Sequence, residues 1–489
     1  PPTLYNSYAS VGLGNYNNAL VDFYTSREFN RGEDLLDFGL THNSSRGDLD
    51  STPLDTDFYN TKLDVTYGKK DRYMDWGAAV GLQHQLYNWY GIQNDVYSED
   101  LVASMDETQN YFNAEAKAHL NMEDSFFKQG NILLRRFWDA TESGENRVVV
   151  NPTIELPITE ELITISAKFD YVGGNFKNAS LNSTTNDGEI NYSQFQAGVT
   201  PSLLILRDDL TVNLGANIVY GLDAENSDSN FYIYPAVTAS YRVMEDNVIA
   251  YGGIEGQLKQ NSYHDFVDEN PYVSPTLDIQ PTDQQYEGYV GLKGQLTSNV
   301  GYNIKGSYMA ENRRPLFYLN PENTFRDDEK SYYYGNSFQV FYDDVKTLGV
   351  FGEINVDVNR NFTLGVNAEF YDYDTETDNP AWNLPSIKGS LFMDYQINDQ
   401  WYMGANLFYV GERDDLLSQR ATIDSELEFM QVTLDGFFDA NAHVGYRVND
   451  QLSIFVKASN IANNNYQRWA NFRVQGFQAL AGVSYKFDF

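Results

Sequence analysis

Carboxylate side chains gathered in polar segments are the residues of this chain best suited to chemistry. The acidic candidates lie in two segments and are Asp48, Asp50, Asp55, Asp57, Asp265, Asp268 and Glu269. Hard carboxylate oxygens at this density suit Ca²⁺, although neither segment has the twelve-residue spacing of an EF-hand loop. Solvated loop charge explains any single cluster more simply. Ca²⁺ is therefore the one cofactor that the sequence suggests, and its binding is an expectation.

Side chains suited to catalysis are sparse. The chain has five histidines and no cysteine, which excludes disulfides, thiol catalysis and cysteine-based metal sites. Ser262, His264 and Asp265 form the one grouping of nucleophile, base and acid, but adjacent positions in a loop rarely build a working triad. No metalloprotease, P-loop or dinucleotide-binding motif is present. We therefore expect no enzymatic activity.

The net charge narrows the range of partners. Lys and Arg number 33 against 69 Asp and Glu, a formal charge of −36, so the phosphate backbone of a nucleic acid would be repelled. Two explanations of the acidity stay open. One is a solvated acidic surface, and the other is a set of acidic loops that bind cations or face lipopolysaccharide through bridging divalent ions.

The elements that must position these residues are strands. Apolar and polar residues alternate through Leu210–Tyr220, Phe362–Phe370 and Gln451–Ser459, which is the period of a strand with one apolar face. Tyr is abundant, with 37 residues, and suits a membrane–water boundary. No stretch approaches the run of about 18 apolar residues that a membrane helix needs. A membrane location then requires a closed β-barrel.

The carboxyl-terminal segment has the same alternation and ends on aromatic residues. Its apolar positions include Phe477, Val483, Tyr485, Phe487 and Phe489. An outer-membrane barrel has a reason to end on its most hydrophobic strand, because the last strand closes the ring against the first. We therefore interpret these residues as the barrel-closing strand.

Two classes of connection alternate along the chain. Ten are short and polar, such as Arg207–Asp209, and the others are long and rich in Asp, Asn, Ser and Pro, such as Tyr263–Asp283. Short periplasmic turns and long extracellular loops are typical of outer-membrane barrels. With both termini periplasmic, ten turns predict about 22 strands and a single domain over residues 1–489. A soluble propeller or β-helix is disfavoured, because no repeat of fixed length recurs.

The closing hairpin resembles that of TonB-dependent outer-membrane receptors. The segment Ser459–Tyr466 is rich in Asn, and after a loop Gly482–Phe487 follows as Gly-Val-Ser-Tyr-Lys-Phe. The Asn- and Tyr-rich, cysteine-free composition is similar to that of proteins from Bacteroidota. The resemblance implies a 22-stranded barrel for uptake or passage of a solute, in contact with outer-membrane lipid and lipopolysaccharide.

One departure from that family matters for function. Its members carry a globular plug before the barrel, whereas strand-like alternation here begins at Leu4–Tyr16. We therefore expect the pore to be filled by inward-folded loops, by a segment outside this sequence or by a partner protein. The alternative function is that of a plugless structural subunit in a multi-protein outer-membrane assembly or secretion complex.

Overall fold

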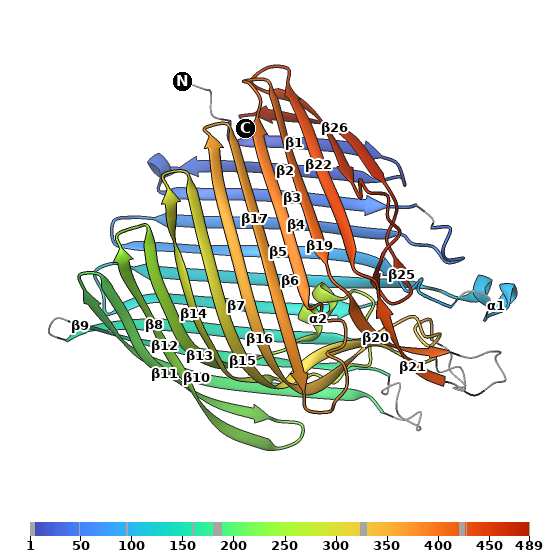
Figure 1. Cartoon of the computed structure of the whole chain (residues 1–489), viewed down its shortest axis with the longest axis horizontal. Coiled ribbons are helices and arrows are strands. Elements are labelled where there is room, and N and C mark those ends of the chain that lie inside the picture. Colours follow the sequence, from blue (N-terminus) through green and yellow to red (C-terminus); the bar gives the residue numbers. More distant parts are fainter. Residues whose placement is uncertain are drawn as a thin grey trace.

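A computed structural model describes residues 5–47, 49–93, 96–158, 161–178, 188–322, 330–419, 426 and 428–488. The chain forms a closed, strongly tilted β-barrel (Figure 1). The strands of its first half are β1 (Ser7–Gly14), β2 (Ala19–Phe29), β3 (Asp34–Ser45), β4 (Phe58–Lys70), β5 (Met74–Asn88), β6 (Thr108–Met122), β7 (Phe127–Asp139), β8 (Gly144–Ile158), β9 (Glu161–Phe176), β10 (Ile190–Arg207) and β11 (Leu210–Asp223).

The second half of the wall starts at residue 228. Its strands are β12 (Asp228–Met244), β13 (Val248–Lys259), β14 (Thr282–Thr297), β15 (Val300–Leu319), β16 (Phe338–Asn359), β17 (Phe362–Thr375), β18 (Ile387–Gln396), β19 (Trp401–Val410), β22 (Phe437–Arg447), β23 (Leu452–Ser459) and β26 (Gln478–Phe487). Together these strands make one 22-stranded sheet. The strand number predicted from the turns is confirmed.

Smaller elements lie in the connections. They are the short helices α1 (Glu99–Ser104) and α2 (Tyr263–Glu269), the 3-10 turn η1 (Asn30–Gly32), the hairpin of β20 (Arg413–Gln419) and β21 (Glu428–Leu434), and the hairpin of β24 (Gln467–Trp469) and β25 (Phe472–Arg473). No helix among the described residues is long and apolar enough to cross a membrane.

The ring closes where the sequence predicts. Strand β26 pairs antiparallel with β1, with Val483 opposite Val11 and Ser484 opposite Ser10. The two serine hydroxyls meet at 2.8 Å on the inner face, while Val483 is 48% exposed on the outer face. Tyr485 shares that outer face, as period-two alternation requires.

The closing strand starts one residue later than the sequence predicts. Phe477 lies one residue before β26, because its N–H donates to the Asn463 side chain at 2.8 Å instead of to a neighbouring strand. Its inclusion in the strand is therefore wrong by one residue. Phe487 is the last residue of β26, and Phe489 lies outside the described residues.

The connections at the two ends of the barrel differ in length. All ten predicted short turns separate strands that pair with each other. The opposite end carries the long loops, although 15–18, 140–143 and 224–227 are short there too. In Figure 1 the short turns run along the left and upper edges, and the opposite end, with α1, faces right and downward.

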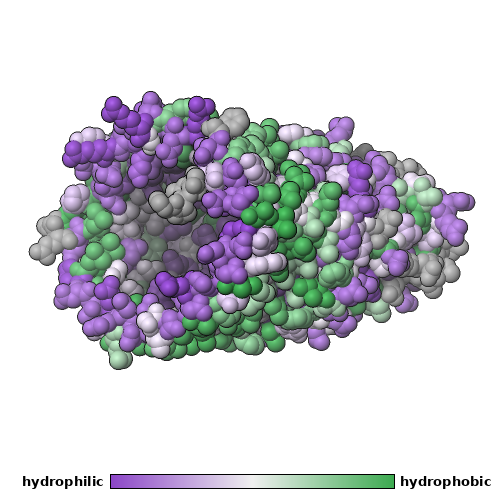
Figure 2. Space-filling view, turned by 90° about the horizontal axis from the view of Figure 1, so that it is seen from above, coloured by the Kyte–Doolittle hydropathy of each residue, from purple (hydrophilic) through white to green (hydrophobic). Residues whose placement is uncertain are grey.

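The outer and inner faces have opposite character. Apolar side chains such as Ile233, 75% exposed, and Val290, 71% exposed, point outward. Figure 2 shows a hydrophobic band across the middle of the face in view. The same view shows a hollow at the short-turn end. A barrel that offers an apolar belt to its surroundings and encloses a polar interior has the design of a membrane barrel.

Candidate functional site

Residues 260–281, between β13 and β14, fold into the lumen at the long-loop end, and we call them the lumen loop. Ser262 caps helix α2 by accepting a hydrogen bond from the Asp265 N–H at 3.1 Å. The apolar side chains Tyr263, Phe266 and Val267 are buried. The Tyr263 ring lies 5.1 Å from Phe137 of β7, between ring centroids, in edge-to-face geometry. The segment is therefore packed as a small core inside the barrel.

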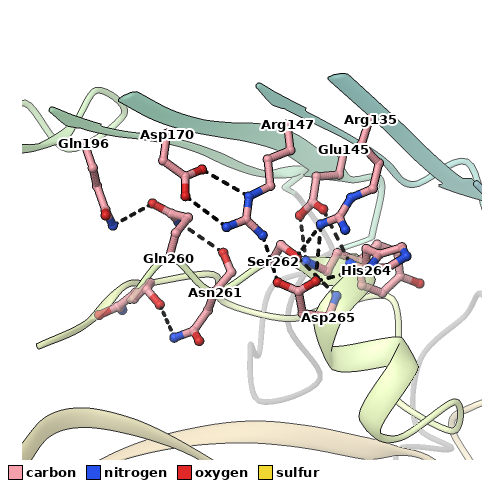
Figure 3. A network of polar contacts seen from close by, with 12 residues as sticks. Arg135, Glu145, Arg147, Asp170, Gln196, Gln260, Asn261, Ser262, His264 and Asp265 are labelled. Carbon is pink, nitrogen blue, oxygen red and sulfur yellow. Dashed lines mark hydrogen bonds and ion pairs between the residues drawn. The ribbon is translucent and has the colours of Figure 1, made fainter. Parts of the chain in front are cut away.

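A polar network joins the lumen loop to the inner wall (Figure 3). Arg135 of β7 and Arg147 of β8 each form an ion pair with Asp265, at 3.2 and 2.9 Å. Arg147 also contacts Asp170 of β9 at 3.0 Å, and Glu145 of β8 accepts a hydrogen bond from the Tyr263 N–H at 2.6 Å. We call Arg135, Glu145, Arg147, Asp170 and Asp265 the wall latch.

Electrostatics keeps the latch charged. Burial opposes ionisation of the Asp265 carboxyl, but hydrogen bonds from His264 and Ser262 and the charges of Arg135 and Arg147 outweigh that effect. The pKa of Asp265 therefore lies well below its usual range. A paired, ionised aspartate is the form that two guanidinium groups recognise best.

The rest of the lumen loop is held by contacts with β16, with β6 and with the two small hairpins. Ser274 donates its backbone N–H to the Phe338 carbonyl at 2.8 Å, and Tyr111 donates its hydroxyl to the Pro271 carbonyl at 2.9 Å. Tyr272 stacks on Phe472 with ring centroids 4.0 Å apart. The hairpins β20–β21 and β24–β25 contribute Leu417, Leu434, Trp469 and Phe472 to the same buried cluster.

A cavity of about 340 Å³ lies between this cluster and the barrel wall. We call it the Arg468 pocket. Its lining includes aromatic side chains, two arginines and two aspartates, among them Asp57, Tyr90, Tyr272, Asp439, Tyr466, Arg468, Phe472 and Arg473. The pocket brings together strands from both ends of the sequence and the tip of the lumen loop.

A second cavity, of about 690 Å³, lies on the inner wall of β13 to β17. Its tyrosines bind neighbouring acids and amides: Tyr289 donates to Glu255 at 2.9 Å and Tyr251 donates to Asn303 at 2.6 Å. Lys305 lies over the Tyr289 ring. These contacts make the wall polar in the half of the lumen nearer the short turns.

The acidic candidates for Ca²⁺ are separated by the fold. Asp265 belongs to the wall latch, and Asp268 and Glu269 are exposed at the end of α2. Asp50 and Asp55 are exposed in the β3–β4 loop, and Asp57 lines the Arg468 pocket. Asp48 lies outside the described residues. Within the part of the chain that the structure describes, no three acidic or His side chains are placed to share a metal ion. Calcium binding stays a prediction.

Ser262, His264 and Asp265 lie together, as their sequence positions suggest, but they act as structural residues. The Ser262 hydroxyl accepts hydrogen bonds from the Asp265 N–H at 3.1 Å and from the Arg135 guanidinium at 3.2 Å. The His264 ring contacts Asp265 at 3.2 Å. These contacts cap a helix and fix the latch, and they do not present the serine oxygen to the histidine ring.

The wall partners of the latch were missed from the sequence. Their signal is nevertheless present, because Glu145 and Arg147 are two residues apart and Arg135 and Asp170 occupy inward positions of their strands. Charged side chains on the inner face of consecutive strands predict a polar contact in the lumen. Which loop would meet them could not be inferred from that pattern.

No protein-family model and no curated protein matches this sequence. The ferripyoverdine receptor of the outer membrane of Pseudomonas aeruginosa is 13% identical, with a TM-score of 0.69 over 100% of this chain and 72% of that one. The FrpB iron transporter of Neisseria meningitidis is 11% identical, with a TM-score of 0.71 over 99% and 82%.

The siderophore receptor PirA of Acinetobacter baumannii is 13% identical, with a TM-score of 0.71 over 100% of this chain and 81% of that one. At such low identity the likeness concerns the fold. The chain thus has the barrel fold of these outer-membrane receptors, and the fold that the resemblance of the closing hairpin implied is confirmed.

Proposed function

We propose that this chain is an integral outer-membrane barrel for the uptake or passage of a solute, closed at its long-loop end by the lumen loop. The observation that carries the proposal is a closed 22-stranded wall whose interior is packed with a segment of the same chain. The barrel fold of siderophore receptors and an iron transporter supports it. Of the three ways to fill the pore, inward-folded loops are the one that the contacts favour.

The topology supports an orientation with both termini in the periplasm. Ser7 of β1 pairs with Phe487 of β26, and the chain turns back at 15–18 on the long-loop end. The start of β1 and the end of β26 therefore lie on the short-turn side. In outer-membrane barrels the short turns face the periplasm and the long loops face outward. The apolar belt then contacts lipid, and the acidic loops lie at the level of lipopolysaccharide.

Passage of a solute requires the lumen loop to move, and the wall latch opposes that movement. Two arginines share one carboxylate of the loop, so removal of their charges leaves Asp265 without its partners in a partly buried position. Losing one side of a buried ion pair is strongly destabilising. We therefore expect closure of the barrel by the lumen loop to be most sensitive to substitutions in the wall latch.

A proteoliposome swelling assay tests the proposal. We expect slow entry of small sugars through the unchanged barrel and several-fold faster entry through Arg135→Gln/Arg147→Gln. The matched control is Arg207→Gln, because Arg207 pairs with Glu161 near the short turns. It should behave like the unchanged barrel. Equal rates for all three folded barrels, or free entry through the unchanged one, would contradict the proposal.

A structural subunit of an outer-membrane assembly complex is the alternative. The solved structures with the same fold are described as receptors or transporters, which favours uptake. Copurification with fixed protein partners, together with no solute entry through the latch variant, is the result that would support the alternative.

A further inference from the structure

Arg468 stands out in the Arg468 pocket, because no described carboxylate forms an ion pair with it. Its backbone carbonyl accepts a hydrogen bond from Arg413, but within the described residues its guanidinium forms no ion pair and donates no hydrogen bond. The side chain lines the cavity and the residue is exposed. The chain has a net charge of −36, yet this cavity contains an arginine without an ion-pair partner among the described residues. Its five N–H donors are available to a ligand.

Aromatic rings build the walls around it. Tyr272 stacks on Phe472 at 4.0 Å, and Tyr90 meets Phe472 edge-on at 4.9 Å. The rings are held in place by polar contacts, since the Tyr90 hydroxyl donates to the Arg473 carbonyl at 2.9 Å. Tyr466 stacks on Phe437 at 3.9 Å and donates to Asp439 at 2.7 Å. Rigid aromatic surfaces accept the flat face of a ring-shaped ligand.

The tyrosines do not cancel the charge of Arg468. Burial raises the pKa of the Tyr272 hydroxyl to about 12, although the Arg468 charge acts in the opposite direction. Burial likewise raises the pKa of Tyr90 well above its usual range. Both hydroxyls are therefore neutral near pH 7 and leave the guanidinium as an available cation.

The aspartates of the pocket limit the negative charge that a ligand bound there could carry. Asp57 and Asp439 line the same cavity, and like charges at close range repel. Arg473 already donates to the Asn465 carbonyl at 3.0 Å, so of the two arginines that line the pocket Arg468 is the one that donates no hydrogen bond to another described residue. A single negative charge fits this balance better than two.

From these contacts we infer that the Arg468 pocket binds a ring-shaped solute that carries one carboxylate. The carboxylate forms a charge-assisted hydrogen bond with Arg468, and the ring lies against Tyr272 and its aromatic neighbours. Both a sugar acid and an aryl acid have this chemistry. The volume of about 340 Å³ accommodates one such ring with its substituents.

The position of Tyr272 links this inference to the proposed function, on which it rests. Tyr272 belongs to the lumen loop and at the same time forms a wall of the pocket. A solute held there touches the barrier that must move for passage. Ligand binding and barrier opening remain separate measurements, so the failure of one is distinguishable from the failure of the other.

Calorimetric titration of the detergent-solubilised full chain tests the inference, with glucuronate and benzoate as anionic probes and glucose and benzamide as neutral counterparts. We expect saturable binding of at least one anion and weaker binding of its neutral counterpart. Arg468→Gln should weaken anion binding by about tenfold or more, since a hydrogen bond to a charged group is lost. Arg468→Lys should retain part of the affinity.

Arg360→Gln is the matched control, because Arg360 is an exposed arginine in the turn between β16 and β17. It should leave binding unchanged. Binding of glucuronate but not benzoate identifies a sugar acid as the ligand class, and binding of benzoate but not glucuronate identifies an aryl acid. Equal affinity for anionic and neutral probes, no saturable binding of either anion, or equal losses in Arg468→Gln and Arg360→Gln would overturn the inference. If a variant fails to fold, the affinities of the unchanged chain for the anionic and the neutral probes still test the inference.

Discussion

At the scale of single residues, the lumen depends on a few charged side chains. Arg147 alone bridges Asp170 of the wall and Asp265 of the loop. Glu145 adds hydrogen bonds from the Tyr263 backbone and from the Tyr192 hydroxyl at 2.8 Å. A partly broken network of this kind is unfavourable, because each buried polar group without a hydrogen-bond partner costs several kcal/mol in lost hydration. It therefore specifies one position for the lumen loop.

The acidic residues show what can be predicted at this scale. Their chemistry is readable from the sequence, but their partners are not, because Asp265 meets arginines more than a hundred positions away along the chain. Arg468 could not be selected from the sequence either. Its distinguishing property is the absence of a neutralising partner among the described residues, which only the folded arrangement reveals.

A pH effect is predicted at Asp415 of β20. Its side chain is fully buried and one oxygen, Oδ2, has no hydrogen-bond partner among the described residues. Burial raises the pKa of this carboxyl to about 6. The folded state therefore holds the proton more tightly than the unfolded state. Stability of the β20–β21 hairpin is greatest below the unfolded pKa and falls as the pH rises to about 6, by up to about 3 kcal/mol.

Hydrogen exchange of the hairpin, corrected for the intrinsic pH dependence of exchange, measures this effect. Asp415→Asn should give a hairpin of nearly constant stability from pH 4 to pH 7. Asp414→Asn, one position away and hydrogen-bonded to Thr433, should keep the decline. A decline that persists in Asp415→Asn would show that another group is responsible.

At the scale of elements, the strands and turns follow from period-two alternation and turn chemistry. Each of the ten predicted short turns lies between two strands that pair with each other. Strand ends are less predictable, since β15 continues to Leu319 through an irregular pairing between Glu311 and Arg314. The inward course of the lumen loop is a tertiary effect. Its one local signal is a set of apolar residues, Tyr263, Phe266 and Val267, inside a polar loop.

The closing strand offers a test of which face meets lipid. Val483 points outward and Ser484 points inward toward Ser10. Val483→Arg should destabilise the barrel folded in lipid vesicles, lowering its free energy of unfolding by about 2–4 kcal/mol, the cost of a basic residue on the lipid face. Ser484→Arg, at the next position, should cost much less. Urea titration of refolding into vesicles compares them, and equal losses would argue against the assignment of faces.

At the scale of the whole molecule, the barrel is asymmetric along its axis. The short-turn end is hollow (Figure 2), whereas the long-loop end contains the largest buried cluster, built from the lumen loop, two small hairpins and the wall. The 22-stranded ring and its closure were predictable because each follows from local pattern and counting. The internal barrier was one of three options, because strand periodicity carries no information about what occupies the lumen.

Single-channel conductance in planar bilayers shows whether the lumen loop closes the barrel. The two proteins compared are the unchanged chain and a variant in which residues 263–279 are replaced by a short glycine–serine linker. We predict almost no current through the unchanged barrel and large, stable current steps from the folded variant, because the variant lacks the segment joined to the wall by Asp265 and Glu145. Large steps from the unchanged barrel, or none from the folded variant, would contradict this prediction.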